Sequence, residues 1–215
     1  MVAPAFSSLF FVLFVSSARG TAILRRDDGC RSFPTSGVPN NNNAFELWAQ
    51  FEDKSTIPLA LSTFSTSTTN VQEVYLAPTG LAGEIVANLF TLKNSGLVSS
   101  GSSDDSGTNT TWVSNSVDAG GPFPFSLSDP TVDDGIAEDY CEVANTDPAG
   151  SIVDGPLLAA DGATDGWAIC NRTDNAQYQG VVFQPASYSS DYDFDFTTCQ
   201  NVAIYLRSSA LGNAP

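Results

Sequence analysis

The stretch "AFELWAQFE", residues 44–52, alternates apolar and polar side chains over nine positions. Successive side chains of a β-strand point to opposite faces of the sheet, so this alternation is typical of a half-buried strand. The expected inward set is Phe45, Leu47, Ala49 and Phe51, and the expected outward set is Glu46, Trp48, Gln50 and Glu52. The stretch therefore predicts a strand with one face in the core and the other open to solvent.

Similar short runs recur to the end of the chain, separated by turn sequences such as "APTG", "DAGGP" and "TDPAG". The runs are "PLALSTF", "QEVYLA", "EIVANLFTL", "TTWVSN", "FPFSLS", "YCEVAN", "GPLLAA", "GWAIC", "QGVVFQ", "YDFDF" and "NVAIYL". None has sustained helical spacing, and many short strands at regular intervals predict an all-β fold. We expect one antiparallel β-sandwich of the jelly-roll type over residues 44–208, with a closed barrel or a trefoil as the alternatives.

The hydrophilic segment "SSGSSDDSGTNTT", residues 99–111, is predicted to be a long surface loop. Residues 21–43 are rich in turn-forming residues and are predicted to be a pro-segment followed by an irregular arm. Residues 209–215 are expected to be a short C-terminal tail.

Residues 1–20 have the pattern of a secretory signal peptide. The apolar run "LFFVLFV" at 9–15 is followed by small residues, and it is too short for a transmembrane helix. Arg25 and Arg26 then form a dibasic pair, the kind of site that late-secretory proteases cleave. Cleavage after Arg26 leaves 5 basic residues against 24 acidic ones, so the net charge changes from −16 to −19.

A secreted protein is exposed to an oxidising environment, in which an even number of cysteines predicts disulfides. The chain has four cysteines, which allow three connectivities. We expect Cys170 to pair with Cys199, joining two late strands, and Cys30 to pair with Cys141, tying down the N-terminal arm. Two sequons, at Asn109 in an expected loop and at Asn171 beside Cys170, predict N-glycosylation.

The segment "DYDFDF", residues 191–196, places three aspartates at every second position. A calcium loop of the EF-hand type would need Gly at its sixth position and Glu at its twelfth, where this chain has Phe196 and Val202. The strand interpretation is therefore favoured. It places Tyr192, Phe194 and Phe196 in the core and the three aspartates, Asp191, Asp193 and Asp195, on the solvent face.

The chain contains no histidine, which excludes Ser-His-Asp and Cys-His catalysis and every histidine-ligated metal centre. Disulfide formation would leave no thiol nucleophile. The tripeptide Asp105-Ser106-Gly107 matches an aspartic-protease motif, but it occurs once and in a hydrophilic segment. A pair of carboxylates could still hydrolyse glycosidic bonds, although no pair stands out. We therefore expect no catalytic residue, no metal and no cofactor.

The formal charge of −16 and the sequence pI of about 4.1 describe a strongly acidic protein. Such a protein repels nucleic acids and anionic lipid surfaces, so neither is an expected partner. Trp48 lies on the polar side of its strand, where a flat indole ring could stack on a sugar. It is the predicted ligand platform, although most tryptophans are half-buried structural residues.

Several segments carry a resemblance to a known family. They are "AFELWAQ" (44–50), "DAGGPFPFSL" (118–127), "TDGWAICNRT" (164–173), the "GVVF" run, and Cys199 leading into "NVAIYL". This layout resembles a family of small secreted proteins of filamentous fungi whose function is unknown. More loosely, with "VYLAPTG" (74–80), it resembles fungal cell-wall proteins linked to phialide and conidium development.

The resemblance implies a fungal β-protein that is secreted or associated with the cell wall. Together with the residue-level reading, it leads us to expect a glycosylated, non-enzymatic wall or surface protein that contacts polysaccharide. A secreted effector that binds a host extracellular protein is the first alternative. A carboxylate-based carbohydrate-active enzyme is the second.

Overall fold

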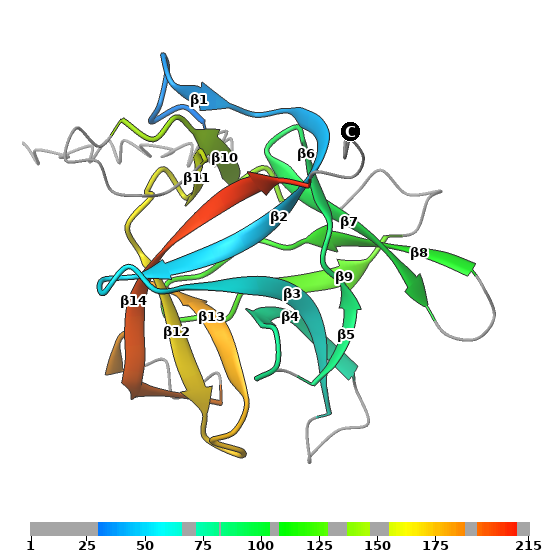
Figure 1. Ribbon diagram of the computed structural model, residues 1–215, viewed down its shortest axis with the longest axis vertical. Coiled ribbons are helices and arrows are strands. Elements are labelled where there is room, and N and C mark those ends of the chain that lie inside the picture. The colour runs from blue at the N-terminus through cyan, green and yellow to red at the C-terminus, as the bar shows by residue number, and fades with distance from the viewer. Residues whose placement is uncertain are drawn as a thin grey trace, which may run out of the picture.

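The computed structural model describes residues 30–65, 72–81, 83–103, 108–128, 137–146, 155–187 and 193–209 (Figure 1). The expected signal peptide, the dibasic pair Arg25-Arg26 and the tripeptide at 105–107 lie outside these ranges. Within them the structure contains β-strands and connecting turns and no α-helix.

The strands follow one another along the chain with short connections. They are β1 (Gly37–Val38), β2 (Asn41–Phe51), β3 (Thr56–Ser65), β4 (Gln72–Pro78), β5 (Glu84–Ala87), β6 (Phe90–Lys93), β7 (Gly96–Ser103), β8 (Thr108–Ser114), β9 (Pro124–Leu127), β10 (Tyr140–Val143), β11 (Leu157–Ala160), β12 (Trp167–Arg172), β13 (Gln179–Phe183) and β14 (Phe194–Ser208).

All strand pairings are antiparallel, and the main sheet has the order β1-β10-β11-β14-β2-β6-β7-β8-β9-β4-β3-β5. β12 pairs with β14, and β13 pairs with β12. β3 also pairs with β2, which closes a ring of strands around the core. β14 pairs with one edge of β2. The other edge is shared, because β6 pairs with the first part of β2 and β3 with its last part. The ring is therefore not a regular barrel. The predicted all-β, antiparallel sandwich is confirmed (Figure 1).

β2 has the alternation that its sequence predicts as far as Ala49, but Phe51, predicted to lie in the core, is only partly buried. Phe45, Leu47 and Ala49 are buried, whereas Glu46 and Trp48 on the other face are partly exposed. The strand begins at Asn41, three residues before the expected start. Gln50 differs from the other outward residues because it is only 9% exposed, which shows that something covers this end of the outer face.

The prediction of a loop at residues 99–111 is wrong. β7 and β8 form a hairpin whose ladder runs from Val98↔Val113 to Ser103↔Thr108. The sequence conceals β7 because small polar residues occupy core-facing positions: Ser99 is 1% exposed and donates its hydroxyl to the Leu89 carbonyl. At Gly101 the Val86 carbonyl oxygen lies 2.0 Å from the position that a Cβ would take, so a larger residue would displace the neighbouring chain. The expected loop position of Asn109 is likewise wrong, since its backbone belongs to β8.

The expected strand "YDFDF" is confirmed only in part. Phe194 is fully buried, but Phe196, predicted to lie in the core, is 39% exposed. β14 pairs Asp195 with Asn171 and Gln200 with Ile169, so it contains extra residues between these two points, and this bulge breaks the alternation. Asp193 is exposed and Asp195 partly exposed, as expected, while Asp191 and Tyr192 lie outside the described residues.

Both expected disulfides are present, Cys30–Cys141 and Cys170–Cys199. Cys30–Cys141 packs with Phe33, Val143 and Ala159 and attaches the N-terminal segment to β10. Cys170–Cys199 links β12 to the bulge of β14.

The centre of the core is aromatic. Phe123 is fully buried, and its ring stacks on those of Phe125, Tyr140 and Trp167 at centroid distances of 5.2, 4.8 and 5.1 Å. Trp167 also meets Phe183 edge-on and donates its indole N–H to the Leu158 carbonyl. These contacts join β9, β10, β12 and β13 into one core.

A second cluster surrounds Arg172 of β12, which is only 3% exposed. Its guanidinium donates two hydrogen bonds of 2.8 Å to Asp174 and lies over the rings of Phe64 and Phe194. The hydrogen bond with Asp174 raises the pKa of Arg172 and, in return, lowers the pKa of Asp174. The Asp174 carboxylate thus compensates the buried charge of the Arg172 guanidinium, which would destabilise the fold if it had no partner.

We expect the Asp174→Asn variant to lose about 1–2 kcal/mol of unfolding free energy at neutral pH, less than a fully buried pair because the Asp174 side chain is 36% exposed. The folded-state pKa of Asp174 is depressed, so its contribution is present above the unfolded pKa of about 3.9 and is lost as the pH falls through the folded value. Denaturant melts across this range should show the two proteins converging at low pH. Asp118→Asn, at an exposed position, is the control, and a difference that stays constant with pH would contradict the assignment.

Candidate functional site

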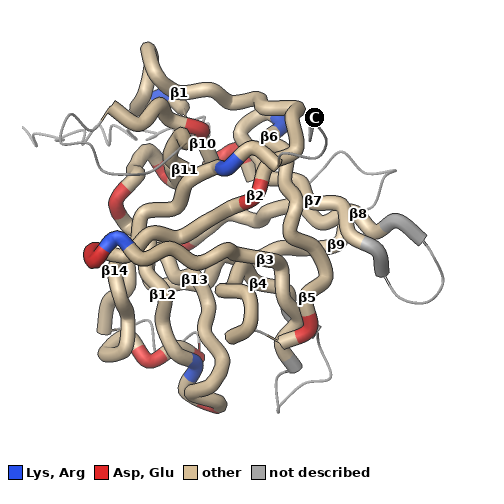
Figure 2. The backbone as a smooth tube through the Cα atoms, viewed as in Figure 1, with Lys and Arg blue, Asp and Glu red and all other residues tan. Residues whose placement is uncertain are grey.

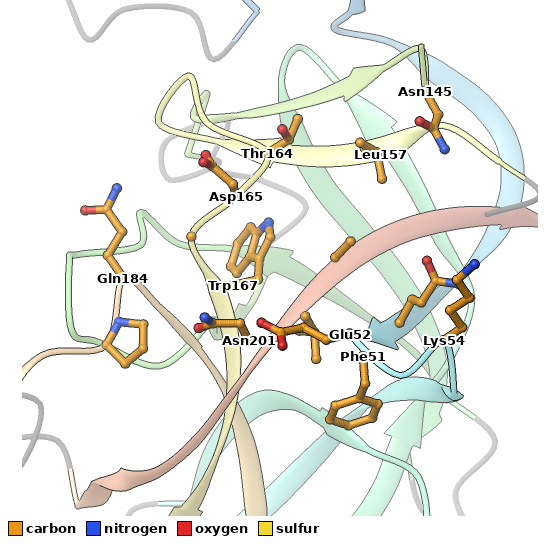
Figure 3. A pocket seen from close by; sticks show the side chains of 15 residues that line it. Phe51, Glu52, Lys54, Asn145, Leu157, Thr164, Asp165, Trp167, Gln184 and Asn201 are labelled. Atoms are coloured by element: carbon orange, nitrogen blue, oxygen red, sulfur yellow. The ribbon is translucent and has the colours of Figure 1, made fainter. Parts of the chain in front are cut away.

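A cavity of about 720 Å³ opens beside the end of β2 (Figure 3). This volume is within the range of small-molecule sites. Its lining residues come from six parts of the chain: Gln50, Phe51, Glu52, Lys54, Asn145, Leu157, Thr164, Asp165, Gly166, Trp167, Gln184, Pro185, Asn201, Val202 and Ala203. The cavity therefore exists only in the assembled fold.

Neighbouring strands form the base of the cavity. Gln50 of β2 is directly opposite Ala203 of β14 on the outer face of the sheet. Leu157 of β11 and the turn that leads into β12 contribute the opposite wall, with Thr164 and Asp165 on that turn (Figure 3). Trp167, which is 1% exposed, lies at the bottom, held by the aromatic core.

Gln50 is the most informative residue of the site. Its side chain is 9% exposed and lines the cavity, yet its amide has no hydrogen-bond partner among the described residues. Among the described residues the buried side-chain atom without a hydrogen-bond partner is Ser116 Oγ, so the Gln50 amide still reaches the solvent of the cavity. A partner that enters the cavity would supply both a donor and an acceptor for this amide.

Two residues of the rim have left-handed backbones that non-glycine residues seldom adopt, Lys54 with φ of 69° and Gln184 with φ of 45°. Lys54 ends the three-residue loop at 52–54 between β2 and β3, which is closed by the bond from Phe51 N–H to the Ser55 carbonyl. The Gln184 N–H donates to the Gly166 carbonyl at 2.5 Å. Such conformations cost about 1 kcal/mol each and are common at functional sites.

The charged groups of the rim come from the two turns. Glu52 and Lys54 belong to the β2–β3 turn, where Figure 2 shows acidic and basic positions side by side, and Asp165 belongs to the turn before β12. None of the three forms an ion pair with a described residue. The cavity thus combines amide groups, carboxylates, one ammonium group and the aromatic Phe51, a set that can hydrogen-bond hydroxyls and pack against an apolar ring face.

Trp48, the predicted ligand platform, lies on the same face of β2 as Gln50 but does not line the cavity. Its indole N–H donates to Glu46 at 2.9 Å, and the Arg207 guanidinium lies 4.8 Å from its ring centroid. One ring face is therefore occupied by a cation. The depression beside Trp48 is also smaller, about 260 Å³. A stacking role for Trp48 stays a prediction.

The second sequon residue, Asn171, is partly exposed in β12, and its side-chain oxygen accepts a hydrogen bond from the Gln179 amide at 2.9 Å. The side chain of Asn109, the first sequon residue, lies outside the described part of the structure. Glycosylation at both positions stays a prediction.

In the described ranges, no group of three potential ligands among Cys, Asp and Glu could hold a metal ion. No helix in these ranges is long and apolar enough to cross a membrane.

Sequence reasoning missed the cavity. Glu52 and Gln50 appear in the alternation of β2 as ordinary solvent-facing residues, and Asp165 and Gln184 lie in plain turn sequences. The one available signal was the turn sequence "ATDG" before a strongly apolar strand. It marks a turn and gives no indication that the β2–β3 turn lies opposite.

Comparisons with known proteins add no assignment: no family model, no curated protein and no solved structure matches the chain.

Proposed function

We propose that the protein is a secreted, non-enzymatic, surface-associated or wall-associated protein that binds polysaccharide in the cavity beside the end of β2. The observation that carries the proposal is the Gln50 amide, which lines a 720 Å³ cavity, reaches the solvent of that cavity and makes no hydrogen bond with a described residue. Sugar hydroxyls both donate and accept hydrogen bonds, and side-chain amides do the same.

The surrounding residues support this ligand class. The cavity is open to solvent, as a site for one segment of a long polymer must be, and Asn201 and Gln184 add further amides without a described side-chain partner. Phe51 and Pro185 offer apolar surface of the kind that packs against the ring face of a sugar. The two disulfides suit an extracellular protein.

The test is retention of the protein, secreted from its full-length chain, on insoluble chitin, β-1,3-glucan and cellulose. We expect retention on one polymer. The Gln50→Ala variant should bind the matching soluble oligosaccharide about tenfold more weakly, the usual size of one or two lost hydrogen bonds. Gln177→Ala, the same substitution at an exposed position outside the cavity, is the matched control.

Stability provides a second readout. Because the Gln50 amide makes no described hydrogen bond, its removal should leave the unfolding free energy unchanged within about 1 kcal/mol or raise it. Weaker binding without lower stability would identify Gln50 as a ligand contact. If no polymer retains the wild type, the polysaccharide proposal is wrong, and a host extracellular protein becomes the leading partner.

The enzyme alternative has one specific observation in its favour, because Glu52 and Asp165 both line the cavity. Glycoside hydrolysis needs two such carboxylates, one as acid and one as base or nucleophile. Release of reducing ends from the bound polymer, abolished separately by Glu52→Gln and by Asp165→Asn, would establish this alternative.

A further inference from the structure

The two disulfides differ in their access to solvent. Cys30 is 8% exposed and Cys141 is 0% exposed, so the first disulfide is enclosed by the fold. In the second disulfide Cys170 is also 0% exposed, but Cys199 is partly exposed and lines a depression of about 490 Å³. Of the four cysteines, Cys199 is therefore the one that a thiol in solution can approach while the protein stays folded.

The exposed end of this disulfide lies in the bulge of β14. Residues 196–199 bulge out of the ladder between β12 and β14, opposite Cys170. On both sides of them the ladder is intact, at Asp195 and at Gln200. Phe194, which begins the strand, is 0% exposed, and beyond the bulge β14 pairs with β2. Opening of the disulfide would therefore loosen the bulge without detaching β14.

The hydrogen bonds of the bulge are mostly internal. The Asp195 carboxylate accepts the N–H and the hydroxyl of Thr197, and the Thr198 hydroxyl donates to the Asp195 carbonyl. Towards β12, the Asn171 N–H donates to Thr198 Oγ1 at 2.9 Å. The disulfide is thus the strong connection that holds the bulge against β12.

The bulge leads directly into the wall of the cavity. Gln200 and Asn201 follow Cys199 in the chain, and Asn201 lines both the depression and the cavity beside the end of β2. Asn201 is opposite Ala168 in the ladder, so the disulfide and the ladder together fix its position. A change at Cys199 therefore reaches a cavity-lining side chain through two residues of the same strand.

We propose that Cys170–Cys199 is a redox switch. A thiol reductant opens it in the folded protein while Cys30–Cys141 persists, and its opening loosens the bulge and the adjoining wall of the cavity. Exposed disulfides are the labile and regulatory ones, because exchange requires access to a sulfur atom. The effect on ligand binding rests on the proposed function, whereas the selective opening does not.

The exchange balances with a dithiol as reductant. Its thiolate attacks Sγ of Cys199, the S–S bond breaks, and Cys170 leaves with the electron pair and takes up a proton. The second thiol of the reductant then attacks the reductant's own sulfur in the mixed disulfide and releases Cys199 as a thiol. The protein disulfide is thereby reduced to a dithiol, and the reductant is oxidised to a disulfide.

The first test measures which disulfide opens. The folded secreted protein is treated with dithiothreitol, its free thiols are trapped with iodoacetamide at successive times, and the labelled cysteines are mapped by mass spectrometry. We expect Cys170 and Cys199 to be labelled at least about tenfold faster than Cys30 and Cys141. Equal rates for the two pairs, or faster labelling of Cys30 and Cys141, would overturn the proposal. Reduced thioredoxin in a parallel reaction shows whether a protein dithiol reaches Cys199 as well as a small one.

The second test measures what the opening does. Hydrogen exchange of residues 195–201 should be at least about tenfold faster in the selectively reduced protein than in the oxidised one, while β10 keeps its rates. A protein that carries both Cys170→Ala and Cys199→Ala should match the reduced form without any reductant. The Cys30→Ala and Cys141→Ala double variant, measured where circular dichroism shows it folded, is the matched control. Unchanged exchange in the bulge after reduction would refute the switch.

The third test measures ligand binding. On the polymer that retains the wild type, the Cys170→Ala and Cys199→Ala double variant should bind about tenfold more weakly, and the Cys30→Ala and Cys141→Ala control should bind as the wild type does. Equal binding by all three proteins would overturn control of the cavity and leave the proposed function intact. If no polymer retains the wild type, the proposed function is wrong, and labelling and exchange still decide whether the disulfide opens selectively.

Discussion

Replacement of Cys30 and Cys141 by alanine is expected to lower the free energy of unfolding by about 5 kcal/mol, the largest loss that we predict for this protein. The disulfide closes a loop with a sequence separation of 111 residues. In the chain-entropy account, a crosslink stabilises by restricting the unfolded chain, and the effect grows with the logarithm of loop length. It also joins the N-terminal segment to β10 within the cluster of Phe33, Val143 and Ala159.

The second disulfide of the same chain provides the matched comparison. Cys170–Cys199 spans 29 residues, so its removal by Cys170→Ala and Cys199→Ala should cost about 3–4 kcal/mol. Equilibrium denaturation of both double variants against the oxidised wild type gives the two losses. A Cys170–Cys199 variant that melts like the wild type, or a reversed order of the two losses, would show that loop entropy does not govern their contributions.

The Phe123→Ala variant is expected to lose about 4 kcal/mol of unfolding free energy. Truncation of a fully buried Phe typically costs about 3–5 kcal/mol of unfolding free energy. The fold loses the favourable transfer of the ring from water to the core, and a cavity remains in its place. Phe123 is 0% exposed and has three stacked aromatic neighbours, each of which loses a ring contact. Its backbone also bridges strands, through the bonds from Phe123 N–H to the Val181 carbonyl and from Leu76 N–H to the Phe123 carbonyl.

Leu127→Ala is the control for Phe123, because Leu127 belongs to the adjacent β9 and is 61% exposed. We expect its loss to be about 0.5 kcal/mol or less. Urea melts of both variants measure the difference. A loss below about 2 kcal/mol for Phe123→Ala would mean that Tyr140 and Trp167 collapse into the space, so that the stacked cluster is not the rigid centre of the core.

Much of the fold could be predicted from the sequence because its signals are local. Alternation in β2 assigned Phe45, Leu47 and Ala49 to the core, and the structure confirms all three. The failures occurred where a distant segment changes the environment of a strand. Ser99 and Gly101 looked like loop residues, but Gly101 lies against the Val86 carbonyl, where only a small residue fits, and Ser99 donates its hydroxyl to the Leu89 carbonyl. The bulge in β14 likewise moves Phe196 to the surface although the alternation of its sequence is regular.

The sequence by itself left three pairings of the four cysteines possible, but it determined the all-β class and the acidity that disfavours anionic partners. These depend on residue type and period, and both act over a few neighbouring positions. Only the tertiary structure decided the disulfide pairing and placed Gln50, which is outward-facing by its position in β2, in one cavity with Leu157 and the turn before β12. Gln50, Glu52 and Asp165, which are up to 115 positions apart in the chain, thus line one cavity. Strand order and turn packing bring them together, and these arise from long-range contacts that no local pattern of residues encodes.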